Sequence, residues 1–352
     1  TITIMAARGA VRLIMVLVPS ASILVGYLAV SVVDKGLSFR DKSIKWVIWP
    51  IAAIIVLATF SSGYQFYKIS KDTAASYIPS IYTQQWQKAM AWTRDNTEKN
   101  AVFGHWWDYG YWVQSIGERA SVLDGGNAIG YWNHLMGRHA LTGSDERKAL
   151  EYLYAHNTTH FLIDSTDIGK YTAFASIGSD VNYDRRSWIP TFGRDNSQVF
   201  EAKNRTIYIY RGGFSLDEDI AYELNGKQIF LPGVNNQPTN KVSNIAGIGG
   251  IKLEIDNNSS ALLQPMAIFV YQGNQYEIPL RYAYRDRLMD FGSGLEAGIF
   301  LYPRFNQQGN QIQIEPDGSL LYLSKRTVKS QLARLYLYGE ETDAFKLAYK
   351  EN

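Results

Sequence analysis

The chain has 352 residues, of which 46% are hydrophobic and 14% aromatic, enough for two or three units with separate cores. A formal net charge of +2, with no stripe of basic residues in the polar part, argues against a nucleic-acid partner. The lack of Cys excludes a disulfide framework, thiol catalysis and Cys-ligated zinc. The sequence starts at Thr1 without a signal-peptide pattern, so we expect the later part of a longer gene product.

Two apolar segments open the sequence, Leu13–Val33 and Trp46–Tyr67. Each has about 20 residues, the length of helix that crosses the roughly 30 Å hydrocarbon core of a bilayer. The short loop between them carries four basic residues: Lys35, Arg40, Lys42 and Lys45. Basic loops stay in the cytoplasm. We therefore expect a protein of the cell membrane, with everything after about residue 67 on the extracytoplasmic side.

Residues 79–212 read as a mixed α/β domain. Helical spacing of apolar residues predicts helices at 82–96 and 146–156, and short apolar runs predict strands at 101–103, 160–164 and 207–210. A further helix starts just after residue 164, with Ser165 or Thr166 as its N-cap.

From residue 213 the pattern changes to strands and turns. Residues 251–255 alternate with period two, residues 267–271 form a second apolar strand, and Asp317-Gly318 between two strand-like runs predicts a hairpin. The predicted fold class is a membrane-anchored α+β chain: two transmembrane helices (1–78), a central α/β domain (79–212) and a β-rich C-terminal domain (213–352).

The strongest local signal is the aromatic run at 105–112, in which Trp106, Trp107 and Asp108 are adjacent. Indole N–H groups only donate hydrogen bonds, and an ionised carboxylate only accepts them. Together they match a hydroxyl, which does both, and a pocket built for a hydroxyl rejects an analogue that lacks it. The alternative is an aromatic corner of the core in which Asp108 caps a turn.

Two further groups of residues stand out. Asp167, Lys170 and Phe174 share one face of the predicted helix, although from spacing alone they form an ordinary surface pair beside an apolar residue. Arg8 and Arg12 lie one helical turn apart at the start of the first apolar segment. Charges are costly there unless they reach the interface or a polar partner, and snorkelling to the interface is the simpler interpretation.

The run Trp-Trp-Asp-Tyr-Gly at 106–110 resembles the signature of oligosaccharyltransferase catalytic subunits. Its surroundings at 86–92, 122–127, 131–136, 140–143 and 331–338 resemble the archaeal AglB-type branch. The resemblance implies that Trp106, Trp107 and Asp108 hold the Ser/Thr hydroxyl two residues after an acceptor Asn. Asp167 and Lys170 look like the family's Asp-X-X-Lys motif, whereas Asp164 lacks a Lys three residues later. Phe174 stands where the family commonly has Met or Ile.

By the same resemblance, Arg12 falls where the family binds the pyrophosphate of the lipid-linked donor. A guanidinium suits bidentate contact with phosphate oxygens. The implied reaction moves a glycan from a polyprenyl (pyro)phosphate to Asn of Asn-X-Ser/Thr sequons. The implied partners are the lipid-linked oligosaccharide, the acceptor polypeptide, the membrane and the remainder of the catalytic subunit.

The family's divalent cation (Mn²⁺ or Mg²⁺) and its catalytic acids belong to earlier segments of the subunit. We therefore assign no catalytic residue and no metal ligand to this chain, and we expect it to be inactive alone. Four sequons occur on the predicted outer side, at Asn157, Asn204, Asn257 and Asn258. The alternative function is a non-enzymatic, membrane-anchored module that binds peptides or glycans through the aromatic pocket.

Overall fold

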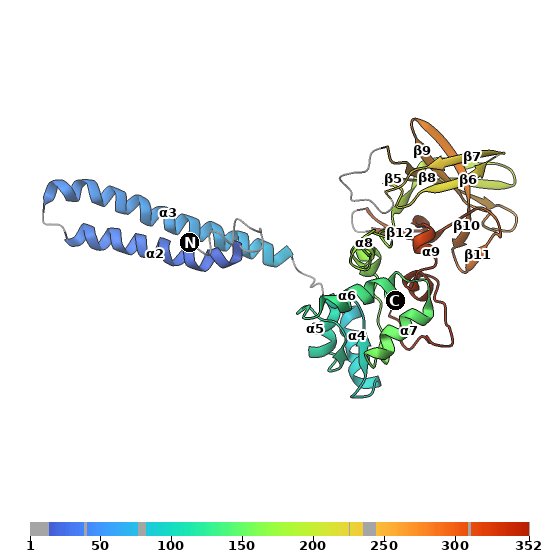
Figure 1. Ribbon diagram of the computed structural model, residues 1–352. Helices are drawn as coiled ribbons and strands as arrows, with labels where there is room; N and C mark the ends of the chain where they lie inside the picture. Colours follow the sequence, from blue (N-terminus) through green and yellow to red (C-terminus); the bar gives the residue numbers. More distant parts are fainter. Residues whose placement is uncertain are drawn as a thin grey trace. The chain divides into compact units, whose positions relative to one another are not determined.

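The computed structural model describes residues 14–38, 41–76, 82–224, 226–234, 244–308 and 311–351. The chain divides into two compact units, Thr1–Gln84 and Gln85–Asn352, and each is described by itself (Figure 1). Arg8 and Arg12 lie outside the described residues.

The first unit is a pair of helices, α2 (Ile14–Ser38) and α3 (Lys42–Ser76), that run side by side (Figure 1). Each helix contains one Pro residue, Pro19 in α2 and Pro50 in α3. Their large apolar side chains are mostly exposed, and by length and composition both helices can cross a membrane. With 35 residues, α3 is about 52 Å long. It is therefore longer than the apolar segment from which it was predicted, and it extends past a bilayer core.

The second unit begins with a small parallel sheet in the order β2-β1-β3. Its strands are β1 (Val102–Gly104), β2 (Ala120–Ser121) and β3 (His160–Phe161). Around it lie α4 (Gln84–Asn96), η2 (Trp107–Tyr109), α5 (Gly110–Ser115), α6 (Gly130–Leu135), the π-helix η3 (Met136–Leu141), α7 (Glu146–Ala155) and α8 (Thr166–Ile177). The helices predicted at 82–96 and 146–156 are confirmed to within two residues.

The β-rich part is one larger sheet in the order β11-β10-β12-β13-β4-β5-β8-β9. Because β9 also pairs with β10, the sheet closes on itself, around a core that includes Phe192, Tyr210 and Phe269. Its strands are β4 (Thr191–Glu201), β5 (Arg205–Ser215), β8 (Gly247–Asp256), β9 (Met266–Tyr271), β10 (Asn274–Tyr284), β11 (Leu288–Asp290), β12 (Leu295–Gln308) and β13 (Gln311–Leu323). A separate hairpin joins β6 (Ile220–Leu224) and β7 (Lys227–Leu231).

Two expectations about this region change. The hairpin predicted at Asp317-Gly318 is wrong, because both residues lie inside the continuous strand β13. The pairing of β12 with β13 shifts register between Tyr302 and Arg304, and a Cβ on Gly318 would lie 2.4 Å from that of Arg304. Gly318 therefore lies at a β-bulge, where a side chain would clash with Arg304, and it is not part of a turn. The large sheet starts at β4, before the domain boundary expected at residue 212, and that boundary falls inside β5.

Two short helices close the chain, α9 (Lys325–Val328) and the π-helix η5 (Ala333–Leu337). They form a second apolar core with Leu321 and Leu323 of β13, and Ile168 of α8 packs against it. This core holds one side of α8 against the large sheet. The fold class is the one expected: two apolar helices, then a mixed α/β region, then a β-rich region.

Candidate functional site

The residues singled out in the sequence follow neighbouring parallel strands. The run at 106–110 comes directly after β1, and α8 comes after β3, which is paired with β1 in parallel. The carboxyl ends of parallel strands lie at one edge of a sheet, where ligands bind in open α/β folds. The topology therefore brings the two segments together, although they are about 60 positions apart in the sequence.

Trp106 is an enclosed member of the site. Its side chain is 2% exposed, and its rings lie 4.7 Å from Phe174 and 6.5 Å from Trp107, centroid to centroid. Phe174 is fully buried, whereas Trp107 is only half-buried. The sequence predicted an open pocket lined by both indoles, but Trp106 is buried beneath the surface. Trp107 and Asp108 form the part of the site that reaches the surface.

Asp108 and Lys170 form the ion pair that joins the two segments. Lys170 Nζ lies 2.8 Å from Asp108 Oδ2, and the two side chains are 30% and 28% exposed. Lys170 Nζ also donates a hydrogen bond to the Tyr109 hydroxyl at 3.0 Å and lies 4.5 Å from the centre of the Tyr109 ring, within range of a cation–π contact. One ammonium group therefore contacts two consecutive residues of the aromatic run.

Tyr109, which the sequence did not single out, is the hub beneath this pair. Its hydroxyl donates to Asp167 Oδ1 at 2.5 Å and lies 2.8 Å from Thr166 Oγ1. Its ring packs 4.9 Å from that of Trp86 on α4. Burial, together with the charge of Asp167, raises the pKa of the Tyr109 hydroxyl, so this group stays protonated and serves as a donor. A Tyr directly after Trp-Trp-Asp was the available signal.

Asp167 belongs to the interior and is not a surface residue. Its side chain is fully buried, and its Oδ2 accepts a hydrogen bond from the Asp164 backbone N–H at 3.0 Å. Asp164 in turn accepts from the backbone N–H of Thr166 at 2.9 Å. These two bonds close the first turn of α8 in the manner of a capping box. Ser165 occupies the expected N-cap position, but its side chain makes no capping hydrogen bond, and the Asp164 carboxylate bonds the backbone in its place. Burial raises the pKa of Asp167 to about 6, against the hydrogen bonds and Lys170 that lower it.

His105 is a second buried polar group that the sequence did not single out. Burial lowers its pKa to about 4, so the imidazole is neutral at physiological pH. Its Nδ1 lies 2.7 Å from the carbonyl oxygen of Trp106, which places the proton on Nδ1. This contact fixes the backbone at the start of the aromatic run.

Gly110 ends the run where the chain passes closest to the segment after β2. A Cβ at this position would lie 2.4 Å from the Leu123 carbonyl oxygen and 2.5 Å from Cα of Asp124. Asp124 holds that segment in place by accepting hydrogen bonds from Gln114 Nε2 at 3.0 Å and from the Gly126 N–H at 2.8 Å. The segments that follow β1 and β2 are therefore in backbone contact.

A divalent cation does not fit the described residues, since no group of three or more His, Cys, Asp or Glu side chains in them is arranged to hold a metal. The part of the site that reaches the surface contains the Asp108–Lys170 ion pair and the half-buried Trp107. It can bind a small group that both donates and accepts hydrogen bonds.

The segment that holds this site is similar to known proteins. Residues 99–212 match the family model of the STT3/PglB/AglB core domain. The dolichyl-phosphooligosaccharide-protein glycotransferase 1 of Pyrococcus furiosus is 28% identical over 133 residues, which cover 37% of this chain and 13% of the relative. The protein of the same name from Pyrococcus horikoshii is 33% identical over 115 residues, covering 32% and 12%. The STT3 subunit of the Saccharomyces cerevisiae dolichyl-diphosphooligosaccharide–protein glycosyltransferase is 23% identical over 228 residues, covering 59% and 30%.

Two solved structures are similar in part. The C-terminal globular domain of an Archaeoglobus fulgidus oligosaccharyltransferase has 22% identity and a TM-score of 0.23 over 29% of this chain and 69% of that one. The C. jejuni PglB C-terminal domain has 12% identity and a TM-score of 0.38 over 75% and 96%.

The class that these observations indicate is a globular region whose residues 99–212 are similar to the STT3/PglB/AglB core domain, in a chain that also has two apolar helices. More particularly, the sequence matches confirm the resemblance to archaeal AglB-type catalytic subunits. The matched part of the chain spans only about an eighth of the two Pyrococcus relatives.

Proposed function

We propose that this chain is the acceptor-reading part of a membrane oligosaccharyltransferase. That enzyme moves a glycan from a polyprenyl (pyro)phosphate to Asn in Asn-X-Ser/Thr. The observation that carries the proposal is the ion pair between Asp108 and Lys170, partly exposed beside Trp107. The globular unit faces the extracytoplasmic side in this proposal, in keeping with the basic loop between the two apolar helices.

The ion pair suits the hydroxyl of a Ser or Thr two residues after the acceptor Asn. Such a hydroxyl accepts a hydrogen bond from Lys170 Nζ and donates one to Asp108, so it satisfies both charged groups at once. An Ala or Val at the same position makes no hydrogen bond to Asp108 or Lys170 and excludes water from both groups. Leaving hydrogen-bonding groups unpaired costs about 1–3 kcal/mol each. Trp107 supplies a half-buried apolar wall beside the pair, and Trp106 with Phe174 supports that wall from behind.

The experiment uses full-length enzyme with its lipid-linked donor and a fluorescent Asn-X-Thr peptide, compared with the same peptide carrying Ala or Val at the third position. We expect kcat/KM to fall by on the order of 100-fold or more for the altered peptides. Asp108→Ala should impose a similar loss on the Thr peptide. Asp290→Ala is the matched control, because it breaks a comparable ion pair with Arg281 on the large sheet. Equal transfer to all three peptides would refute the assignment.

The donor side of the proposal rests on Arg12, whose guanidinium suits the oxygens of a diphosphate. Arg12→Gln should raise KM for the lipid-linked donor at least about tenfold and leave KM for the peptide unchanged, since one lost charge-assisted contact is worth about 1.5–3 kcal/mol. Arg8→Gln, four positions earlier in the sequence, is the control. Equal effects of the two variants on donor KM would show that Arg12 has no special contact with the donor. The divalent cation of the full enzyme, with ligands outside this chain, remains part of the same proposal.

A further inference from the structure

The C-terminal end of α8 is capped by two side chains from one neighbouring helical segment. His134 on α6 has its Nδ1 2.8 Å from the Ile177 carbonyl oxygen, and Arg138 on η3 donates from Nη1 to the Gly178 carbonyl oxygen at 3.0 Å. The last carbonyls of a helix have no partners within the helix, so a neighbour that supplies donors fixes the position of that end. His134 and Arg138 are four residues apart, where α6 continues into η3.

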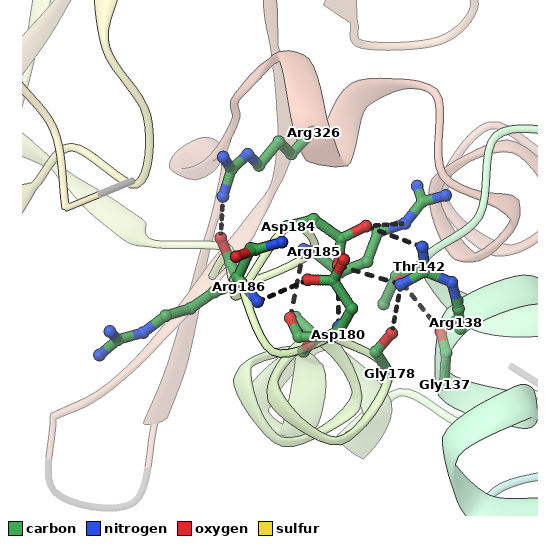
Figure 2. Close-up of polar contacts among 12 residues, drawn as sticks. Gly137, Arg138, Thr142, Gly178, Asp180, Asp184, Arg185, Arg186 and Arg326 are labelled. Atoms are coloured by element: carbon green, nitrogen blue, oxygen red, sulfur yellow. Dashed lines mark hydrogen bonds and ion pairs between the residues drawn. The ribbon is translucent and has the colours of Figure 1, made fainter. Parts of the chain in front are cut away.

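Arg138 also fixes the chain that leaves α8. Its Nη1 and Nη2 donate to Oδ1 and Oδ2 of Asp184 at 3.0 and 2.8 Å, a forked contact shown in Figure 2. The backbone N–H of Asp180 donates to the same carboxylate at 3.0 Å. One guanidinium thus bonds both the end of the helix and the loop behind it. A bidentate pair of this kind defines geometry as well as energy.

The two helical segments touch through their backbones. A Cβ on Gly137 would lie 2.7 Å from the Phe174 carbonyl oxygen, and a Cβ on Gly178 would lie 2.5 Å from the Arg138 backbone nitrogen. These distances leave no space for α8 to move toward η3. The π-helical turn of η3 is where Gly137 and Arg138 occur together, and such turns often lie beside functional sites.

Lys170 lies between two anchors on α8. The first turn is fixed by the Tyr109 hydroxyl, which contacts Thr166, Asp167 and Lys170. The last turn is fixed by His134 and Arg138. An α-helix of 12 residues is about 18 Å long and moves as a rigid rod, so a displacement at its end is passed on to Lys170.

We infer that Arg138, with His134 and Asp184, is a positioning clamp for the helix that reads the acceptor hydroxyl. The inference rests on the proposed function of Lys170. A displacement of about 1 Å in a binding group costs a large factor in rate or affinity, so the clamp keeps Lys170 Nζ at the distance where it serves Asp108 and an incoming hydroxyl together. Arg138 contacts no substrate in this arrangement.

The test uses full-length enzyme with Arg138→Gln, Arg138→Lys and Asp184→Asn. We expect KM for the Asn-X-Thr peptide to rise about tenfold in Arg138→Gln, and less in Arg138→Lys, which keeps the charge but loses the fork. KM for the lipid-linked donor should stay unchanged. Because KM does not depend on how much enzyme is folded, a purely structural role of Arg138 would lower only the apparent kcat. Unchanged peptide KM in all three variants would overturn the inference.

Two additions keep the result clear. Arg147→Gln breaks an exposed ion pair with Glu151 on the neighbouring helix α7 and should leave both KM values at the wild-type level. If wild-type enzyme transfers equally to peptides with Thr and Ala at the third position, the proposed function itself has failed. If wild-type enzyme discriminates between them while the Arg138 variants keep wild-type peptide KM, only the clamp is wrong.

Discussion

The ring of Phe174 packs against the indole of Trp106, with centroids 4.7 Å apart and planes inclined by 56°. Both side chains are almost fully removed from solvent. An aromatic residue at position 174 therefore acts as the support behind Trp106 and does not face an arriving peptide. The aromatic side chain of the run that reaches the surface is the half-buried Trp107.

Removal of this support should be costly. Phe174→Ala deletes a fully buried ring and leaves a cavity beside Trp106, so we expect the free energy of unfolding to fall by about 3–5 kcal/mol. Thermal melting of the full chain, followed by tryptophan fluorescence, measures the change. Phe200→Ala removes a ring that is 57% exposed and should change stability by less than about 1 kcal/mol. Similar melting temperatures for the two variants would mean that Phe174 is not a packing residue.

Tyr109→Phe should remove the hydroxyl that contacts Thr166, Asp167 and Lys170 and keep the aromatic ring. The buried Asp167 then loses its donor at 2.5 Å, and an unsatisfied buried acceptor costs about 1–3 kcal/mol. Lys170 also loses one of its two polar partners, so peptide KM should rise. Tyr152→Phe is the control, because the Tyr152 hydroxyl bonds only the carbonyl oxygen of Trp132, at 3.1 Å, among the described residues. A larger effect of Tyr152→Phe than of Tyr109→Phe on peptide KM would contradict the role given to Tyr109.

Asp167 should make stability depend on pH. Its pKa of about 6 lies above the ordinary value of 3.8, so between these values the unfolded chain loses a proton that the folded chain keeps. Stability from this group is therefore complete at pH 3.8 and below and falls as pH rises toward 6, by about 3 kcal/mol in total.

The variant Asp167→Asn isolates this effect, since an amide does not titrate. We expect the difference in unfolding free energy between wild type and Asp167→Asn to shift by about 3 kcal/mol in favour of the variant between pH 4 and pH 7. Chemical unfolding at several pH values provides the data. A difference that stays constant over this range would show that Asp167 titrates normally in the folded protein.

Local sequence patterns predicted the helices well and the arrangement of the sheets poorly. Amphipathic spacing located α4 and α7, because one face of each is buried. The strand predicted at 160–164 is confirmed in part, as the two-residue strand β3. The strand β2, also of two residues, is too short for any periodicity to reveal. That β3 pairs with β1, and so brings α8 to the aromatic run, is a property of long-range pairing.

The sequence predicted which residues belong to the candidate site better than it predicted how deeply each one is buried. Asp108 and Lys170 form an ion pair. Residue spacing on a helix does not predict burial, however. Asp167 was therefore predicted to lie at the surface and Trp106 to line an open pocket, whereas both side chains are buried. Tyr109 and His105 were overlooked because a lone Tyr or His beside Trp residues is an ordinary core residue by composition. Tyr109 has its role because its hydroxyl bonds Asp167, which is about 60 positions away in the sequence. His105 has its role because its Nδ1 contacts the carbonyl oxygen of Trp106.

The close approach at Gly110 means that the last residue of the aromatic run has to be a glycine in this fold. Any side chain there would act as a wedge between the peptide planes at 123 and 124 and those of the run itself. The wedge would tilt the turn that presents Asp108, although it touches neither that carboxylate nor Lys170. The residue without a side chain thus determines the orientation of the charged one, because a β-carbon at position 110 would force the two segments apart.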